Sequence, residues 1–282
     1  MPPTTTSLIG RFRLVSKIKD GSVGTVYKVA DSANRVLAVK MISAENAARA
    51  GAVKAFKREA GLGRKLSHRG IIKIHEYAAN EGRPFFVMDY FKSESLRAGA
   101  PRGKEFYILR QMAAALAYVH GQGIVHRDLK PENVLVGDEA EIRLIDFSLA
   151  QTKWTGLNPF GRRVEGTPAY MAPEQALGRK CDRRTDIYAF GCIAYELLAK
   201  APAFAAPSEA ELLKKHVNEE PPPLRASVPA IKRELEALVG RCLAKKPDDR
   251  WADMTAILHE FGKWEKEASG VRMSQVADID GS

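Results

Sequence analysis

Alternating apolar and polar residues mark two short segments near the start of the chain. They run from Phe12 to Ile18 and from Val36 to Met41, with glycine and polar residues between them. Side chains of a strand point alternately to its two faces, so this alternation predicts strands with one buried face. Two such strands separated by a turn predict a strand-turn-strand unit. A third apolar run, from Pro84 to Phe91, predicts a buried strand that leads into a linker.

Helical periodicity appears in two longer segments. The first runs from about Asn46 to Leu66, with Val53 and Phe56 on its apolar side. Gly61 and Gly63 lie inside it, and each should cost about 1 kcal/mol relative to alanine, which predicts a loosely held helix. In the second segment the apolar residues recur every three to four positions, and two glycines follow it. These residues are Phe106, Leu109, Met112, Ala113, Leu116 and Val119, followed by Gly121 and Gly123.

Length and composition are those of a globular protein. The chain has 282 residues, of which 45% are hydrophobic, enough for a core with two lobes. The segment from Pro221 to Pro223 is predicted to be an interhelical loop, and both ends of the chain are predicted to be flexible. No signal peptide or bilayer-spanning run is present, which favours a cytoplasmic protein. The three cysteines lack metal-binding spacing and are predicted to be reduced thiols, and the six histidines show no zinc pattern.

The formal net charge is +10. Such a charge can indicate nucleic acid, an anionic membrane or an acidic peptide as a partner, but an ordinary solvated surface explains it as well. No nucleic-acid-binding motif accompanies the charge, so no nucleic-acid partner is expected.

The segment from His126 to Asn133 has the sequence HRDLKPEN and is followed by Asp146 and Phe147. Phosphoryl transfer requires a carboxylate to accept a hydroxyl proton, oxygen ligands for magnesium and a cation near the developing charge. Asp128 is the candidate base and Lys130 the candidate cation. Asn133 and Asp146 carry hard oxygen ligands suited to Mg²⁺.

This segment resembles the catalytic loop of protein kinases, and Asp146 with Phe147 resembles their metal-binding turn. A second string, from Gly166 to Glu174, resembles the end of the activation segment of serine/threonine kinases. The style of both motifs is that of eukaryotic-like (Hanks-type) serine/threonine kinases of bacteria. The resemblance implies an α+β, bilobal protein-kinase fold. Residues 10–88 would form a lobe of antiparallel sheet plus one helix, 89–92 the hinge and 93–266 a mainly helical lobe, with 1–9 and 267–282 flexible.

The resemblance also implies a set of site residues. Lys40, which follows Leu37, Ala38 and Val39 as in the V-A-I-K pattern, would bind the α- and β-phosphates of ATP and pair with Glu59. Thr167 would hydrogen-bond toward Asp128 and Lys130. Gly21 and Gly24, between the first two predicted strands, would allow backbone amides to approach phosphate oxygens, although an ordinary hairpin explains these glycines equally well. The residues expected at the nucleotide are Ile18, Gly21, Gly24, Val26, Ala38, Met88, Asp89, Phe91, Leu135 and Ile145.

Two further pairings implied by the resemblance are structural. Glu174 would pair with Arg250, and Asp186 would anchor the backbone of the catalytic loop. The expected cofactors are ATP and Mg²⁺, with Mn²⁺ as a possible substitute. The expected partners are protein substrates with Ser or Thr, and an activating partner or a second copy of the chain that would hold the Glu59 helix. Basic residues flanking Thr167 suggest acidic residues near the phosphorylated hydroxyl. They are Arg162, Arg163, Arg179, Lys180, Arg183 and Arg184.

The sequence departs from the kinase pattern at three places. Lys19 replaces the first glycine of the nucleotide loop, and Ser148 replaces the glycine of DFG. The segment 158–165 contains no hydroxyl residue, so any activating phosphorylation would fall earlier, at Thr152 or Thr155. A pseudokinase scaffold that binds nucleotide or partners without turnover therefore remains an alternative. A small-molecule kinase is a third alternative, but the string from Gly166 to Glu174 would not be expected in it.

Overall fold

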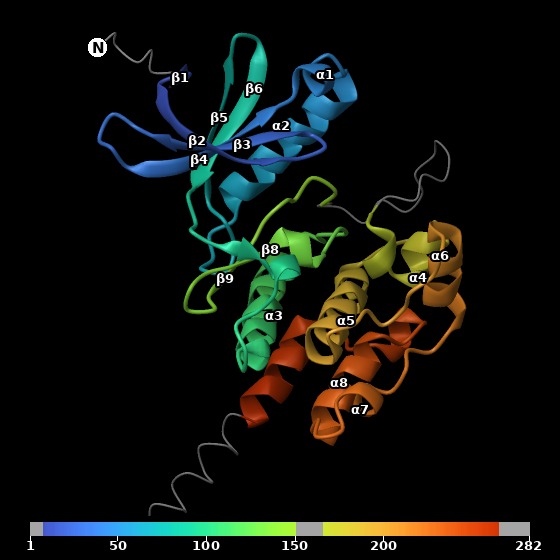
Figure 1. Ribbon diagram of the computed structural model, residues 1–282. Coiled ribbons are helices and arrows are strands. Elements are labelled where there is room, and N and C mark those ends of the chain that lie inside the picture. The colour runs from blue at the N-terminus through green and yellow to red at the C-terminus, as the bar shows by residue number, and fades with distance from the viewer. Residues whose placement is uncertain (1–7, 151–165, 265–282) are drawn as a thin grey trace, which may run out of the picture. The chain divides into compact units, whose positions relative to one another are not determined.

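The computed structural model describes residues 8–150 and 166–264. The chain divides into two compact units, one formed by residues 1–99 with 132–150 and one by 100–131 with 151–282 (Figure 1). The first unit is mainly antiparallel sheet and the second mainly helix. The predicted α+β fold is therefore confirmed.

The large sheet of the first unit has the strand order β1-β2-β3-β4-β6-β5, and all neighbours are antiparallel. Its strands are β1 (Leu8–Ile9), β2 (Phe12–Asp20), β3 (Gly24–Ala30), β4 (Val36–Ile42), β5 (Ile74–Asn80) and β6 (Arg83–Asp89). The sequence predicted two strands joined by a turn, but the structure has three. The additional strand, β3, lies between the two apolar runs and pairs with both of them.

The strand β4 shows how the alternating pattern builds two faces. Leu37, Val39 and Met41 point to one face, where they pack in a cluster with apolar residues of β1, β2, β3 and β6. Ala38 and Lys40 point to the other face. There Phe86 of β6 and Ile42 pack against the helix α2.

Two helices stand where a single helix from Asn46 to Leu66 was predicted. They are α1 (Ala44–Ala47) and α2 (Ala50–Lys65), separated by an extended residue, Arg49. The side chain of Asn46 donates to the carbonyl oxygens of Ser22 (2.9 Å) and Val23 (3.3 Å), which ties α1 to the turn between β2 and β3. The prediction of one continuous helix was wrong because this contact between distant residues fixes α1 in its own direction.

The prediction that α2 is loosely held is also corrected at one of its two glycines. A Cβ atom on Gly63 would lie 2.4 Å from the Cδ1 atom of Ile74 in β5, so the missing side chain allows close packing of α2 on the sheet. Gly61 faces open space.

A second, three-stranded sheet belongs to the first unit. It consists of β7 (Glu94–Ser95), β8 (Val134–Val136) and β9 (Ile142–Leu144), with the 3₁₀ turn η1 (Leu96–Ala98) beside it. The amide of Ile72 donates to the carbonyl of Leu144 (3.0 Å), and the amide of Leu144 donates to the carbonyl of Gly70 (2.8 Å). These backbone bonds explain why residues 93–99 and 132–150 group with the first unit, whereas the sequence assigned them to the helical lobe.

The second unit is built around two long helices, α3 (Glu105–Gly121) and α5 (Arg183–Ala199). The helix α3 follows the predicted periodicity, and Gly123 has a left-handed backbone (φ 70°) just after its end. Most of α5 is buried, and Asp182 caps its first turn by accepting from the amide of Arg184 (2.8 Å). The other elements are η2 (Pro131–Asn133), η3 (Pro168–Tyr170), α4 (Pro173–Ala176), α6 (Glu209–Asn218), α7 (Leu224–Ser227), α8 (Arg233–Cys242), η4 (Pro247–Asp249) and a helix over residues 254–264.

Other predictions about the chain can be compared with the structure. The loop from Pro221 to Pro223 lies between α6 and α7 as predicted. All three cysteines are free, and Cys192 and Cys242 are buried. No helix within 8–150 or 166–264 has the length and apolar character needed to cross a membrane. The calls on Thr152, Thr155, Arg162, Arg163, the segment 158–165 and both chain ends lie outside the described residues.

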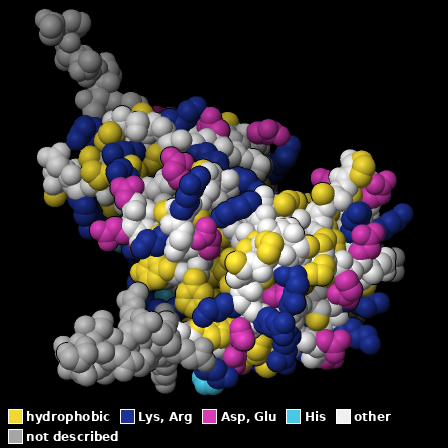
Figure 2. All heavy atoms as spheres, turned by 60° about the horizontal axis from the view of Figure 1, so that its bottom comes forward, with side chains coloured by type: hydrophobic (Ala, Val, Ile, Leu, Met, Phe, Trp, Pro, Cys, Tyr) yellow, Lys and Arg dark blue, Asp and Glu magenta, His cyan; other side chains and the backbone are white. Residues whose placement is uncertain are grey.

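Charged side chains are mixed on the surface seen in Figure 2. Lysine and arginine lie among aspartate and glutamate over this face instead of forming one basic area. This distribution is that of a solvated surface and fits the absence of a nucleic-acid motif.

Candidate active site

The ion pair between Lys40 and Glu59 lies inside the first unit. Lys40 projects from the face of β4 that α2 covers, and Glu59 lies on the buried side of α2. The Nζ atom of Lys40 is 2.7 Å from Oε1 and 3.0 Å from Oε2 of Glu59, and the two side chains are only 15% and 4% exposed. The structure therefore brings together the cation and the carboxylate that the sequence paired.

A third charge acts on this pair. Burial opposes the charged form of Lys40, but the carboxylates of Glu59 and Asp146 outweigh it and raise the pKa of Lys40. Burial raises the pKa of Glu59, against the effect of Lys40, and the charge of Asp146 raises it further. The charges of two carboxylates thus act on one ammonium group, and this excess of negative charge would favour a divalent cation near Asp146.

A short hairpin places the two predicted metal ligands. Asn133 lies directly before β8 and Asp146 lies two residues after β9, at the same end of the β8–β9 pair. The amide of Ile145 donates to the carbonyl of Asn133 (3.0 Å), which holds the two segments side by side. The backbone of Asp146 is left-handed (φ 65°), an uncommon conformation for aspartate that is often found at functional sites.

These residues fit a magnesium ion that keeps other ligands from water or phosphate. No group of three or more His, Cys, Asp or Glu that could hold a metal occurs among the described residues. Mg²⁺ is commonly held by one or two carboxylates together with substrate phosphates, rather than by a full cage of protein ligands. Asp146 and the amide oxygen of Asn133 would supply such a partial set.

The predicted nucleotide residues all lie in the first unit. Val26 of β3 is paired with Lys40, and Ala38 is paired with Met88 of β6, so these four side chains share one face of the sheet. Ile18 lies at an irregularity in β2 and is 49% exposed. Leu135 and Ile145 belong to the β8–β9 region.

Two backbone hydrogen bonds in the predicted hinge limit which of its amides and carbonyls could bond to an adenine ring. The amide of Asp89 donates to the carbonyl of Lys73 (3.0 Å), so its carbonyl is the backbone group of Asp89 that we predict to contact a base. The carbonyl of Phe91 accepts from the hydroxyl of Ser93 (3.0 Å), which leaves the amide of Phe91. One acceptor and one donor would then match the edge of an adenine.

The turn between β2 and β3 has a packing reason for one of its glycines. A Cβ atom on Gly24 would lie 2.0 Å from the carbonyl oxygen of Met41, so the pairing of β3 with β4 by itself requires glycine there. Gly21 closes the turn by donating its amide to the carbonyl of Gly24 (2.8 Å). The phosphate contacts of Gly21 and Gly24 stay predictions.

The second unit contains a closed triangle of three predicted catalytic residues. The Nζ atom of Lys130 lies 2.7 Å from Oδ2 of Asp128 and 2.9 Å from Oγ1 of Thr167. The hydroxyl of Thr167 donates to Oδ1 of Asp128 (3.0 Å). Both carboxylate oxygens of Asp128 are thereby oriented, as a residue that accepts a proton at a fixed position requires.

Asp186 fixes the loop that carries Asp128. Its carboxylate is 1% exposed and accepts from the backbone amides of His126 and Arg127, both at 2.8 Å. Burial opposes ionisation, but hydrogen bonds from His120 and the loop backbone keep the pKa of Asp186 below its usual value. Arg127 has a left-handed backbone (φ 68°), which this carboxylate helps to hold.

His120 is a site residue that the sequence did not identify. Its Nε2 atom lies 2.8 Å from Oδ2 of Asp186. The only sequence signal for it is a histidine in the last turn of α3, shortly before His126.

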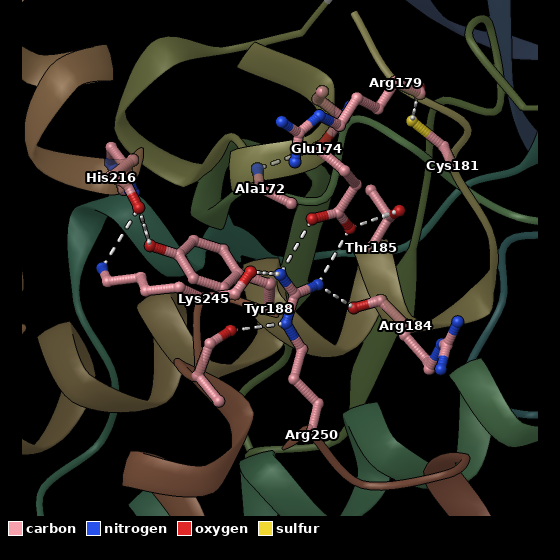
Figure 3. A network of polar contacts seen from close by, with 12 residues as sticks. Ala172, Glu174, Arg179, Cys181, Arg184, Thr185, Tyr188, His216, Lys245 and Arg250 are labelled. Atoms are coloured by element: carbon pink, nitrogen blue, oxygen red, sulfur yellow. Dashed lines mark hydrogen bonds and ion pairs between the residues drawn. The ribbon is translucent and has the colours of Figure 1, made fainter. Parts of the chain in front are cut away.

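A buried ion pair holds Glu174, the last residue of the string that begins at Gly166 (Figure 3). The guanidinium of Arg250 donates from Nη1 and Nη2 to the two carboxylate oxygens of Glu174, each at 2.8 Å. The hydroxyl of Thr185 also donates to Glu174 (2.8 Å). Carbonyl oxygens of Arg184, Ala244 and Lys245 accept the remaining guanidinium hydrogens. The pair expected from the sequence is therefore present and fully hydrogen-bonded.

Two of the basic residues near Thr167 are used in internal bonds. Arg184 pairs with Asp182 (2.8 Å) and Asp248 (2.6 Å), and Arg183 donates to the carbonyl of Ala252 (2.9 Å). These internal bonds weaken the basis for an acidic substrate, because Arg183 and Arg184 are engaged within the chain.

Comparison with known proteins gives the family of this chain. The family model described as "Protein kinase domain" matches residues 12–262. Serine/threonine-protein kinase Pkn1 of Myxococcus xanthus is 36% identical over 259 residues, which cover 88% of this chain and 37% of Pkn1. Serine/threonine-protein kinase PknA of Mycobacterium tuberculosis is 32% identical over 262 residues, or 89% of this chain and 60% of PknA.

Serine/threonine-protein kinase pkn2 of M. xanthus is 34% identical over 265 residues, which cover 89% of this chain and 32% of pkn2. The chain thus spans about a third of the length of the two M. xanthus relatives. Since the family model covers most of the sequence and the two half-sites have the geometry described above, this chain belongs to the protein kinase family.

Proposed function

We propose that this chain is a serine/threonine protein kinase that transfers the γ-phosphate of ATP to hydroxyl groups of protein substrates. The observation that carries the proposal is the triangle of Asp128, Lys130 and Thr167. The triangle holds the carboxylate of Asp128 beside the cation of Lys130. It also joins both residues to Thr167, on the segment that would receive a peptide.

Each residue has a distinct part in the proposed transfer. Asp128 accepts the proton of the substrate hydroxyl. The hydroxyl oxygen attacks the γ-phosphorus, and the bond from the γ-phosphorus to the oxygen that bridges it to the β-phosphate breaks. Lys130 stabilises the charge on the transferred group, and Thr167 keeps Asp128 in place. Lys40, held by Glu59, binds the α- and β-phosphates. Mg²⁺, or Mn²⁺ in its place, would neutralise phosphate charge when held by Asn133 and Asp146.

The choice of serine and threonine rests on two observations. Lys130 stands near the candidate base, where tyrosine kinases usually carry arginine, and Gly166 to Glu174 has the form found in serine/threonine kinases. The relatives named above are serine/threonine-protein kinases. A cytoplasmic location, acidic residues near the substrate hydroxyl and a homodimer remain predictions.

The pseudokinase alternative depends on Lys19 and Ser148. Ser148 is not among the described residues with a positive φ, so serine fits there without left-handed strain. Lys19 is exposed on β2 and paired with Val26. Lys19 lies beside an irregularity of β2 but keeps its pairing with β3, and the amide of Ser148 donates to Asp146.

The test compares three substitutions of aspartate by asparagine. Asp128→Asn should abolish phosphotransfer to a generic acceptor protein while ATP binding, measured by calorimetry, is retained. Asp146→Asn should lose Mg²⁺-dependent ATP binding. Asp138→Asn, at an exposed residue paired only with Lys92, is the matched control and should behave as the wild type. If the wild type transfers no more phosphate than Asp128→Asn to any acceptor or to itself, the pseudokinase alternative is correct.

A further inference from the structure

The outward side of α2 carries an unbalanced set of cations. Residues of the buried side pack against β4, β5 and β6 or, in the case of Glu59, pair with Lys40. Four basic residues lie on the exposed side: three follow one another at spacings of three and seven, and the fourth adjoins the last of them, so all lie within one side of the helix. They are Lys54, Lys57, Arg64 and Lys65, and we call them the α2 basic row.

No ion pair neutralises this row within residues 8–150 and 166–264. Salt bridges join many other basic residues of the described chain to carboxylates, but none joins a member of the α2 basic row. Glu59 is the only acidic residue of α2, and it faces inward. Lys54 and Lys57 lie one turn apart and repel each other, whereas Arg64 and Lys65 lie in the last turn, where positive charge favours the helix.

The start of α2 adds to this imbalance. The first turn contains no acidic residue, and the N-cap residue Arg49 makes no capping bond with its side chain. Negative charge near the start of a helix is stabilising, and here nothing within the helix supplies it. The first turn of the helix that positions Glu59 therefore lacks the negative charge that stabilises a helix start.

We propose that the α2 basic row is a docking surface for an acidic segment of a partner protein, rich in Asp and Glu. Charge complementarity identifies the partner. The row spans about 17 Å at 1.5 Å per residue, which five or six residues of an extended acidic segment cover.

A nucleic acid is the less suitable occupant. Sequence-independent binding of single strands relies on aromatic side chains on which the bases stack, and the exposed positions of α2 contain none.

Docking would act on the site through Glu59. An acidic segment along the row removes the repulsion between the lysines and stabilises α2 in the position that pairs Glu59 with Lys40. This consequence for activity depends on the proposed kinase function, whereas binding to the row does not.

The test measures binding of a fluorescein-labelled peptide of twelve residues, alternating Glu and Gly, by fluorescence anisotropy. The test variant is the triple substitution Lys54→Glu, Lys57→Glu, Arg64→Glu. The control is Lys214→Glu, Lys232→Glu, Arg233→Glu, which changes the net charge equally at exposed residues of α6 and at the start of α8. We expect the test variant to bind at least about tenfold more weakly than wild type, and the control to stay within about twofold.

Folding and activity can be separated in this design. Glutamate at Lys54 and Lys57, in the first half of α2, should not unfold the helix, whereas glutamate at Arg64 is unfavourable in the last turn, so circular dichroism of both variants checks that they are folded. The Asp128→Asn protein should bind the peptide like wild type, so a failure of the kinase proposal would leave the docking result intact. In the active protein the peptide should raise phosphotransfer in wild type and in the control but not in the test variant.

Two outcomes would overturn the proposal. Equal weakening in the test and control variants would mean that the peptide senses only overall charge. Tighter binding of a twelve-nucleotide single strand than of the peptide, dependent on the same three residues, would assign the row to nucleic acid.

Discussion

Arg58 of α2 donates a hydrogen bond from Nη2 to the backbone carbonyl of Ser148, at 2.7 Å. Ser148 in turn donates its amide to Oδ1 of Asp146 (3.2 Å), and Arg58 directly precedes Glu59. Arg58 thus links α2, whose Glu59 pairs with Lys40, to the segment that carries the candidate metal ligand Asp146. All of these residues belong to the first unit.

Arg58→Ala should lower kcat about fivefold at limiting Mg²⁺, because loss of this hydrogen bond, worth about 1 kcal/mol, loosens Asp146 relative to α2. Steady-state kinetics over a range of Mg²⁺ concentrations, without acidic peptide, measures the effect. Arg102→Ala is the control, since it removes an exposed arginine that lies outside α2. Equal kinetics for the two variants would show that the bond has no catalytic consequence.

Ser148→Gly should keep wild-type activity and lower the free energy of unfolding by about 0.5–1 kcal/mol. The backbone of Ser148 needs no left-handed conformation, so glycine only adds freedom to the unfolded chain. Activity assays and urea unfolding test both parts. A large gain of activity in Ser148→Gly would mean that serine at this position impairs the enzyme.

Gly61→Ala and Gly63→Ala should have opposite effects on stability. Gly61 faces open space, so alanine should stabilise α2 by about 0.5–1 kcal/mol. At Gly63 the added methyl group would overlap Ile74 and should destabilise the protein by about 1–3 kcal/mol. Unfolding in urea measures both, and Ile74→Val should partly rescue Gly63→Ala. Stabilisation by both alanines would contradict the packing role of Gly63.

Arg250→Met should destabilise the protein by about 3–5 kcal/mol, because it leaves the buried carboxylate of Glu174 without its cation. Lys92→Met removes an exposed cation from its pair with Asp138 and should change stability by less than about 1 kcal/mol. Chemical unfolding of the two variants gives the comparison. A loss near 1 kcal/mol for Arg250→Met would show that Thr185 and the surrounding backbone suffice for Glu174.

His216 should make the second unit sensitive to acid. Its side chain is fully buried, and burial together with Lys245 lowers its pKa to about 4 from an ordinary value near 6.5. The unfolded chain therefore takes up a proton first as the pH falls. The contribution of neutral His216 is complete above about pH 6.5 and is lost toward pH 4, by on the order of 3 kcal/mol.

His216→Asn should show a shallower loss of stability than wild type between pH 6.5 and 4.5. Denaturant unfolding at several pH values, each compared with the same protein at pH 7, measures this slope. His259→Asn is the control, because His259 is exposed and should leave the slope unchanged. Parallel curves for wild type and His216→Asn would exclude His216 as the source of acid sensitivity.

Local patterns predicted much of this structure, and contacts between distant residues account for what they missed. The alternation around Val39 and the periodicity around Leu116 determine which side chains are buried, so β4 and α3 were found. The pairing of Lys40 with Glu59 followed from family resemblance, since nothing in the local sequence distinguishes Glu59 from a surface residue. The break at Arg49 was missed because it depends on a contact between side chain and backbone across the fold.

The same limit applies to the site. Asp128, Asn133 and Asp146 stand in short strings that identify them. His120 and Arg58 act through hydrogen bonds to residues 66 and 90 positions away, which no local pattern reveals. The sequence suggested that Gly63 only weakens its helix. Ile74, whose side chain leaves no space for a Cβ atom at Gly63, belongs to β5 and could not be linked to Gly63 from the sequence.

The ion pair of Glu174 with Arg250 has a consequence for synthesis of the chain. The two residues are 76 positions apart, so Glu174 leaves the ribosome well before its cation exists. At about 5–20 residues per second, the interval is on the order of several seconds. During that time the carboxylate has no buried partner, and the segment before it cannot settle. The string from Gly166 to Glu174 should therefore be among the last parts of a nascent chain to become resistant to proteases.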